Sequence, residues 1–188
     1  MSQLDYEINK ELGECYLFMG DLEKAEDYYS KAAGCMGTEP DPYMGLATIA
    51  VQQGDLNKAY TLYSKAASIK ADDKALAGMA LVEMETGREP QAFDHFVEAL
   101  QSNPANMVAL YGLIQLGHTQ SRLEEVIVHM ENFLRLEPEK TEIRYSLAGC
   151  LISVGQNERA ADELRALLEK DPENVSAREL YDQLRSAA

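Results

Sequence analysis

The stretch Gly20-Asp21-Leu22-Glu23-Lys24-Ala25 returns 34 residues later as Gly54-Asp55-Leu56-Asn57-Lys58-Ala59. The same short phrase begins again at Gly87, Ser121 and Gly155, after intervals of 33, 34 and 34 residues. A constant period of this length indicates an array of repeated structural units rather than one globular fold. The spacing of these turn residues therefore predicts the architecture.

Alignment on the turn residues predicts a single array over residues 1–188, built of five units. The units span about 6–39, 40–72, 73–106, 107–140 and 141–174. Each unit holds two apolar stretches of helical period, one on each side of the turn. In the second unit the two apolar faces are Tyr43, Leu46, Ala47 and Ala50, and Ala59, Leu62, Tyr63 and Ala66.

The residues between the helices fit a helical hairpin. Glycine supplies the left-handed residue that ends the first helix, and the polar residue after it can cap the second. Pro104, Pro138 and Pro172 then stop the second helix and open the next unit. The sequence therefore predicts an all-α chain of repeated antiparallel hairpins.

Small residues recur where the two helices of a unit would cross, and a large residue recurs in the second helix. The small pairs are Gly13 and Ala25, Ala47 and Ala59, Ala80 and Ala92, and Ala148 and Ala160; the large residues are Tyr29, Tyr63, Phe96, Met130 and Leu164. With Tyr16 in the first helix and a proline at the end of units, this pattern resembles the tetratricopeptide repeat (TPR) family from about Tyr6 to Asn174. The resemblance implies an α-solenoid, a right-handed superhelix of antiparallel hairpins.

The fourth unit departs from the pattern. Its crossing pair is Ile114 and Val126, its turn residue is Ser121, and Phe133 replaces a small residue. Because two β-branched side chains at a crossing force helices apart or shift them, we expect a wider or skewed fourth hairpin. Sequence drift with local repacking and a functional bend are the two interpretations.

The two ends of the predicted array differ. Residues of about 175–187 read as one more amphipathic helix, which would cap the fifth hairpin with its charged face outward. No equivalent helix precedes the first hairpin, so its outer side is a candidate surface for self-association. Whether the chain is full-length or a fragment is left open, as is the oligomeric state.

The charge of the chain excludes some classes of binding partner. The formal net charge of −15 argues against nucleic acid and anionic membranes. Residues 1–39 carry a net charge of −6, whereas residues 40–72 are neutral. This acidic end is either a solvated surface or a region that steers a basic partner segment. With no signal peptide, no apolar membrane span and three cysteines that have neither metal-ligand spacing nor an even count, we expect a cytoplasmic protein with reduced thiols.

The sequence contains no clear pattern of a metal, cofactor or catalytic site. The histidines His95, His118 and His129 lack metal-ligand spacing, and no phosphate-binding loop follows a strand. The carboxylate pairs, Glu83 with Glu85 and Glu124 with Glu125, are interpreted as solvated helix faces. We therefore expect no metal, no cofactor and no catalytic activity.

The family resemblance implies that first helices line a concave groove. The groove residues that it indicates in this chain are Lys10, Glu14, Met44, Gly45, Thr48, Gln52, Lys74, Gly78, Leu81, Glu85, Tyr111, Gly112, Gln115 and Tyr145. Among them Gly45, Gly78 and Gly112 occupy one repeat position, which Ser146 continues in the fifth unit. Because a helical glycine costs about 1 kcal/mol relative to alanine, a steric reason is expected. Either a ligand approaches the groove wall there, or neighbouring helices pack closely.

The predicted groove combines apolar and tyrosine side chains with polar ones. Such a surface suits an extended peptide or an amphipathic helix of a protein partner, since tyrosines combine a rigid ring with a polar tip. The family's clamp for the carboxyl termini of chaperone peptides is disfavoured, because Glu14 stands in place of an Asn and only Lys10 fits. The leading hypothesis is a non-catalytic interaction scaffold. The alternatives are an accessory TPR domain of a larger enzyme, such as a glycosyltransferase, or a bacterial secretion-type chaperone.

Overall fold

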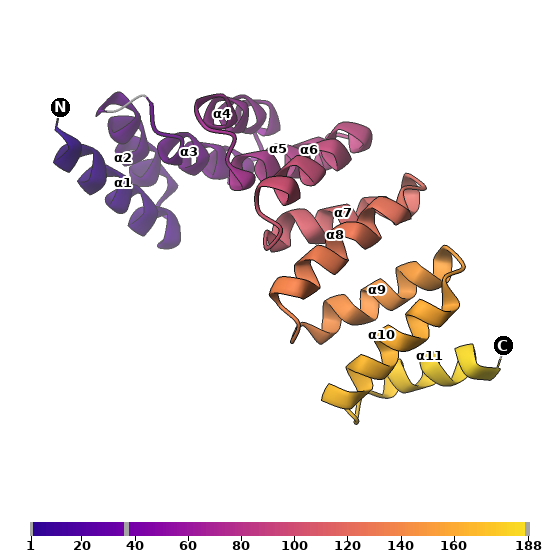
Figure 1. The fold of residues 1–188 in the computed structure, drawn as a ribbon. Helices are drawn as coiled ribbons and strands as arrows, with labels where there is room; N and C mark the ends of the chain where they lie inside the picture. Colours follow the sequence, from indigo (N-terminus) through magenta and orange to yellow (C-terminus); the bar gives the residue numbers. More distant parts are fainter. Residues whose placement is uncertain (1, 36–37, 187–188) are drawn as a thin grey trace. The chain divides into compact units, whose positions relative to one another are not determined.

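The computed structural model describes residues 2–35 and 38–186, and within them the chain forms eleven helices and no strand (Figure 1). The helices are α1 (Gln3–Phe18), α2 (Leu22–Cys35), α3 (Asp41–Gln52), α4 (Leu56–Ile69), α5 (Asp73–Glu85), α6 (Glu89–Ser102), α7 (Met107–Thr119), α8 (Leu123–Leu136), α9 (Thr141–Ser153), α10 (Asn157–Lys170) and α11 (Val175–Ser186). The predicted all-α fold is thus confirmed.

The chain divides into two compact units, residues 1–112 and residues 113–188, and the boundary falls inside α7. Unit 1 contains three antiparallel hairpins, α1/α2, α3/α4 and α5/α6, and the first part of α7. Unit 2 contains the rest of α7 and α8 to α11. In unit 1, α2 packs on α3, α4 packs on α5, and α3 also contacts α1 and α5. In unit 2, α9 packs on α8 and α10, and α10 packs on α11.

The turn inside each hairpin has the predicted left-handed residue. The backbone angle φ is positive at four glycines and at Ser121, where it is 55°. After each of them, the next amide donates a hydrogen bond back over the helix end, as Asp21 N does to Tyr16 O (3.0 Å) and Arg122 N does to Gly117 O (3.1 Å). This closure satisfies carbonyl groups that the helix end would otherwise leave unpaired. Ser121 therefore keeps the turn of the glycines, with a side chain where none is favoured.

Capping of the second helices follows the prediction in only two hairpins. The carboxylates of Asp21 and Asp55 accept hydrogen bonds from Lys24 N and Lys58 N. Arg88, Arg122 and Gln156 stand at the equivalent position of α6, α8 and α10 and make no side-chain cap. The general capping prediction was wrong for these three hairpins, because their side chains are long and two of them have no acceptor atom.

The core lies where successive hairpins meet. Ile49 of α3 packs against Ala25 and Tyr29 of α2. Val82 of α5 packs in the same way against Ala50 and Ala59 of the second hairpin. Because each hairpin completes the core of the one before it, stability spreads through a unit by nearest-neighbour contacts.

The fourth hairpin compensates for its bulky crossing at a second position of α7, Gly117. Val126 is buried, and a Cβ added at Gly117 would stand 2.5 Å from its Cγ2 atom. Gly117 occupies the position that Tyr16 fills in the first hairpin. The absence of a side chain at Gly117 of α7 thus provides the space for Val126 of α8, which favours local repacking.

Glu83 corrects another expectation. Instead of facing solvent, its side chain is 1% exposed, and its Oε2 atom lies 2.7 Å from Nδ1 of His95 on α6. The ring of Tyr60 lies beside this pair, with the Arg88 guanidinium stacked 4.4 Å from the ring centroid. Burial first, and the Glu83 carboxylate next, raise the pKa of Tyr60. Glu83 is therefore part of a buried polar cluster between α4, α5 and α6.

Candidate functional site

The first helices of unit 1 form a surface with two adjoining pockets, which together we call the groove of unit 1. The acidic pocket measures about 460 Å³ and is lined by Glu14, Leu17, Tyr29, Asp41, Met44, Gly45, Thr48, Tyr63 and Lys74. The apolar pocket measures about 360 Å³ and is lined by Val51, Leu56, Tyr63, Gly78, Leu81, Val82 and Glu85. Tyr63 lines both, so the two pockets share a wall.

The structure brings together eight of the predicted groove residues. Five line the acidic pocket (Glu14, Met44, Gly45, Thr48 and Lys74), and three line the apolar pocket (Gly78, Leu81 and Glu85). All of them lie on α1, α3 or α5, as the family resemblance implied. The predicted residues thus lie on one surface within unit 1.

Other predicted residues lie outside these pockets. Lys10 forms an ion pair with Glu7, at 3.1 Å from Nζ to Oε2. Gln52 and Tyr111 belong to unit 1 and are exposed, with Tyr111 at 51%. Gly112 is buried at the end of unit 1, and the remaining two, Gln115 and Tyr145, belong to unit 2.

The repeated glycines of the first helices are explained by packing. A Cβ at Gly78 would stand 2.5 Å from the Tyr63 ring, and a Cβ at Gly45 or Gly112 would overlap the ring of Tyr29 or Phe96. Each of these rings comes from the second helix of the preceding hairpin. The fourth hairpin carries the flexible Met130 at that place, and Ser146 follows it. Close packing therefore accounts for the glycines, and ligand approach is not needed to explain them.

Sequence reasoning identified Tyr29 only as the large residue of a second helix and missed that its tip reaches the groove. The inner ring atoms of Tyr29 lie against Gly13 of α1, and the outer ring atoms lie against Gly45 of α3. The residue is only 4% exposed, it lines the acidic pocket, and its hydroxyl makes no hydrogen bond to another described residue. A ring held between two glycines is the signal that would have found it.

The hydroxyl of Tyr29 stays protonated at neutral pH. Burial first, and then the carboxylates of Glu14 and Asp41, raise its pKa to about 12. The Tyr63 hydroxyl lies 3.3 Å from Oγ1 of Thr48 in the same pocket. Tyr29 and Tyr63 therefore both present a hydroxyl group to the acidic pocket, beside the carboxylates of Glu14 and Asp41.

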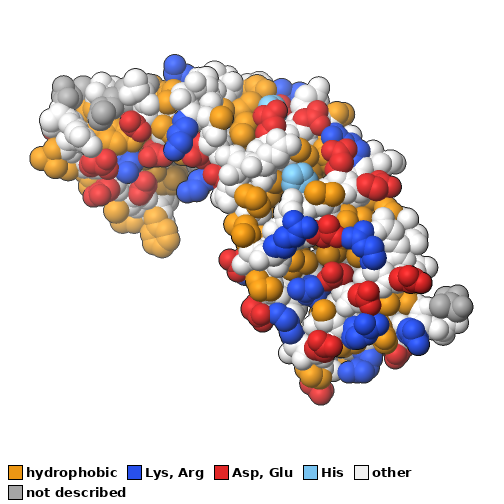
Figure 2. Space-filling model, in the orientation of Figure 1, with side chains coloured by type: hydrophobic (Ala, Val, Ile, Leu, Met, Phe, Trp, Pro, Cys, Tyr) orange, Lys and Arg blue, Asp and Glu red, His pale blue; other side chains and the backbone are white. Residues whose placement is uncertain are grey.

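The groove carries an excess of negative charge. Glu14 and Asp41 form no ion pair with any residue in the described part of the chain, and Lys74 is the cation among the lining residues of the acidic pocket. Unit 1 as a whole has eighteen acidic against eight basic residues. On the face in Figure 2, Lys and Arg side chains are frequent over α8 to α11, and seven of the eight arginines belong to unit 2. Unit 1 is thus the more acidic surface.

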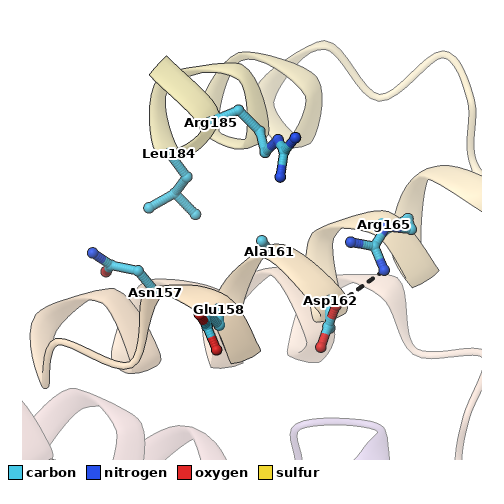
Figure 3. Close-up of a pocket in the computed structure, with 7 residues that line it drawn as sticks. All are labelled: Asn157, Glu158, Ala161, Asp162, Arg165, Leu184 and Arg185. Carbon is cyan, nitrogen blue, oxygen red and sulfur yellow. Dashed lines mark hydrogen bonds and ion pairs between the residues drawn. The ribbon is translucent and has the colours of Figure 1, made fainter. Parts of the chain in front are cut away.

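Unit 2 has a pocket of another kind. A space of about 350 Å³ lies between α10 and α11, where Leu184 points toward α10 and Asp162 holds Arg165 at 3.0 Å (Figure 3). Its lining contains no predicted groove residue. Since α10 is the second helix of its hairpin, this pocket is not part of a surface made by first helices.

Two absences apply to the part of the chain that the structure describes. No group of three or more His, Cys, Asp or Glu side chains is placed to hold a metal ion. None of the helices there combines the length and hydropathy that a membrane crossing requires.

Comparison of sequences gives the family. One sequence model described as tetratricopeptide repeat matches residues 118–184, and a second with the same description matches residues 7–34 and 40–73. Residues 74–117 lie between the matches and include the unusual Glu83 and Gly117. No curated protein matches the chain in sequence.

Comparison of structures gives the same fold. PilF of Pseudomonas aeruginosa has a TM-score of 0.71 at 19% identity, covering 97% of this chain and 84% of PilF. MamA of Desulfovibrio magneticus RS-1 has a TM-score of 0.66 at 19% identity, covering 93% of this chain and 99% of that structure. YrrB, described as a TPR protein with an unusual peptide-binding site, has a TM-score of 0.66 at 15% identity, with coverage of 91% and 89%.

One assignment is supported by the repeated left-handed turns, by the aromatic rings packed on glycines and by the three matched stretches of sequence. Together the family matches cover about two thirds of the residues. The fold is a TPR-type α-solenoid, and the chain belongs to the tetratricopeptide repeat family.

Proposed function

We propose that this protein is a non-catalytic interaction scaffold that binds a segment of a protein partner in the groove of unit 1. TPR proteins bind protein partners or peptides and are generally non-catalytic. YrrB, which shares the fold, is described as having a peptide-binding site. The same class of ligand is what we propose for this chain.

One observation carries the proposal: apolar side chains remain exposed where the first helices border a pocket. Leu81 is 43% exposed and Val51 is 40% exposed, and both line the apolar pocket. Aliphatic side chains of this kind gain about 25 cal/mol for each Å² that a partner covers. An extended segment laid along α3 and α5 would cover both.

A comparison of two arginine substitutions tests this proposal. Leu81→Arg fills the apolar pocket with a long charged side chain, whereas Thr61→Arg adds the same side chain at an exposed site on α4. Each protein is used to capture partners from its native host, followed by mass spectrometry. We expect the wild type and Thr61→Arg to capture the same protein and Leu81→Arg to lose it. Equal capture by all three would exclude the groove of unit 1 as the binding surface.

The predicted surfaces outside the groove of unit 1 stay predictions. Tyr111 and Tyr145 present exposed rings on first helices outside the groove of unit 1. On α1, Leu4 and Ile8 are exposed, as a self-association surface on the first hairpin requires. No observation specifically favours an accessory enzyme domain or a secretion-type chaperone over a scaffold.

A further inference from the structure

We infer that the groove of unit 1 selects an extended segment in which a basic side chain and an aliphatic side chain are separated by one residue. The basic side chain would occupy the acidic pocket, and the aliphatic side chain would occupy the apolar pocket. This inference rests on the proposed function, and it names the chemistry of the partner segment.

The acidic pocket is built to accept hydrogen bonds and positive charge. Glu14 and Asp41 face it from α1 and α3 without an ion pair to a described residue. Both carboxylates raise the pKa of Tyr29, which places them within electrostatic reach of its buried hydroxyl. An ammonium or guanidinium group carries several donors and no acceptor, so it matches two carboxylates and a hydroxyl.

The cations already present neutralise this pocket only in part. The ammonium group of Lys10 is paired with Glu7, and Asp41 and Glu14 act on it at longer range, so that all three carboxylates raise its pKa. Lys74 reaches the pocket from α5, and one lysine offsets one of the two carboxylates. A basic side chain of the partner would therefore supply the missing positive charge, and its position would be on the side of α1 and α3, away from Lys74.

The apolar pocket next to it requires a different side chain. Leu56, Val82 and the exposed Val51 and Leu81 surround the space, and Glu85 is the charged group at its edge. A cation in this pocket would lie mainly against aliphatic side chains, and the loss of its hydration would not be fully offset by new hydrogen bonds or ion pairs. An aliphatic side chain instead removes its own surface and that of Leu81 from water.

Tyr63 sets the spacing between the two positions. Its ring lines both pockets, with the hydroxyl near Thr48 on the acidic side and the ring against Gly78 on the apolar side. Side chains on one face of an extended chain are two residues apart, which is about 6.5 to 7 Å. One tyrosine ring between two adjoining pockets is compatible with that separation. The expected motif is therefore a Lys or Arg, any residue, and a Leu, Ile, Val or Met.

Selection from random peptides tests the motif without knowledge of the partner. A phage-displayed library of random dodecapeptides is selected on the wild-type protein, and the enriched peptides are synthesised with a fluorescent label. We expect enrichment of the basic and aliphatic pair at the stated spacing. Binding is then measured by fluorescence anisotropy at low and high salt, and we expect weaker binding at high salt because the charges are partly exposed.

Variants without the carboxylates test whether the basic residue of the motif binds in the acidic pocket. The double variant Glu14→Gln with Asp41→Asn removes both carboxylates with little change of shape, and we expect the affinity for the enriched peptides to fall by about tenfold or more. The matched control, Glu23→Gln with Glu98→Gln, removes two exposed acids from the second helices α2 and α6. We expect the control to bind the peptides with the affinity of the wild type. Circular dichroism of each variant checks that the helices are retained.

The outcomes separate this inference from the proposed function. If enriched peptides bind but lack the motif, or lose no affinity in the Glu14→Gln, Asp41→Asn variant while Leu81→Arg abolishes binding, the groove stands and the selectivity is wrong. If Leu81→Arg leaves peptide binding unchanged, the groove assignment itself fails. Absence of any enriched peptide would contradict both.

Discussion

Each buried ring on a second helix constrains the residue that the next first helix can carry opposite it. Tyr63 packs on Gly78 and Phe96 packs on Gly112, in the same arrangement as Tyr29 and Gly45. The sequence showed that these glycines recur, but not why, because packing and ligand binding both favour a missing side chain. The positions of the ring atoms favour packing, since only the structure shows how far each aromatic side chain extends toward the next helix.

Alanine at the packed glycine should destabilise the protein. In Gly78→Ala the new methyl group would stand 2.5 Å from the Tyr63 ring, and overpacking of this kind costs about 1–3 kcal/mol. Gly149→Ala in α9 is the matched control, because nothing lies within 4 Å of its Cβ position. There the higher helix propensity of alanine should stabilise by up to about 1 kcal/mol. Urea denaturation measures both, and equal stabilities would contradict the packing explanation.

Glycine at the strained turn should stabilise the protein. Ser121 has a φ of 55° where the other four turns have glycine. Ser121→Gly relieves a left-handed conformation that costs a non-glycine residue about 1–2 kcal/mol, and part of this gain is offset by the greater freedom of glycine when unfolded. We expect a net gain of about 1 kcal/mol in the free energy of unfolding. Gly155→Ser, the reciprocal change, should lose a similar amount; a loss of stability in Ser121→Gly would show that the serine side chain has a role in the turn.

Tyr29 should ionise later than exposed tyrosines. Its pKa is raised from about 10 in the unfolded chain to about 12 in the folded protein. The stability that it contributes is complete below pH 10 and is lost as the pH rises from about 10 to about 12, since the unfolded chain releases that proton first. In an ultraviolet titration of tyrosinate, Tyr29→Phe should remove one tyrosine from the late part of the curve, where Tyr6 and Tyr60, whose pKa values are also raised, remain. Loss of one tyrosine from the early part of the curve instead would show that the Tyr29 hydroxyl ionises as an exposed one does.

At the scale of the helices, local rules predicted the hairpins well. Left-handed turns and prolines act within a few residues, so their positions in the sequence are enough to locate the helix ends. Glu83 shows where such rules fail, because its partner His95 lies on the next helix and the pair is buried between elements. A charged residue on a predicted helix gives no local sign of such a contact. The compensation between Gly117 and Val126 was missed for the same reason.

Removal of His95 tests whether the buried pair joins α5 to α6. His95→Ala leaves the Glu83 carboxylate, 1% exposed, without this hydrogen-bond partner, and leaving a buried acceptor unpaired in this way costs about 1–3 kcal/mol. The double variant with Glu83→Gln should recover part of the loss, because a neutral amide is less costly to bury. Urea denaturation of both single variants and the double variant gives the coupling energy. Additive effects would mean that the pair does not stabilise the hairpin.

At the scale of the whole molecule, the family resemblance predicted which helices would line a groove, and the role of that groove in binding stays a prediction. It identified first helices as the groove, and eight of the predicted residues line two adjoining pockets of unit 1. The residues that it missed, such as Asp41 and the tip of Tyr29, enter the groove through the packing of neighbouring hairpins. The chain divides into two compact units with the boundary inside α7, and the single array over all five hairpins stays a prediction. The proposal that unit 1 binds the partner therefore depends only on the three hairpins of unit 1.

Site-specific photo-crosslinking tests that claim most directly. A photoreactive phenylalanine analogue is placed at Leu81 in the apolar pocket, or at Thr61 on the outer face of α4 as the control, and each protein is irradiated in its native host. The groove account predicts a discrete adduct with one partner protein from position 81 and none from position 61. The same adduct from position 61, with none from position 81, would contradict it.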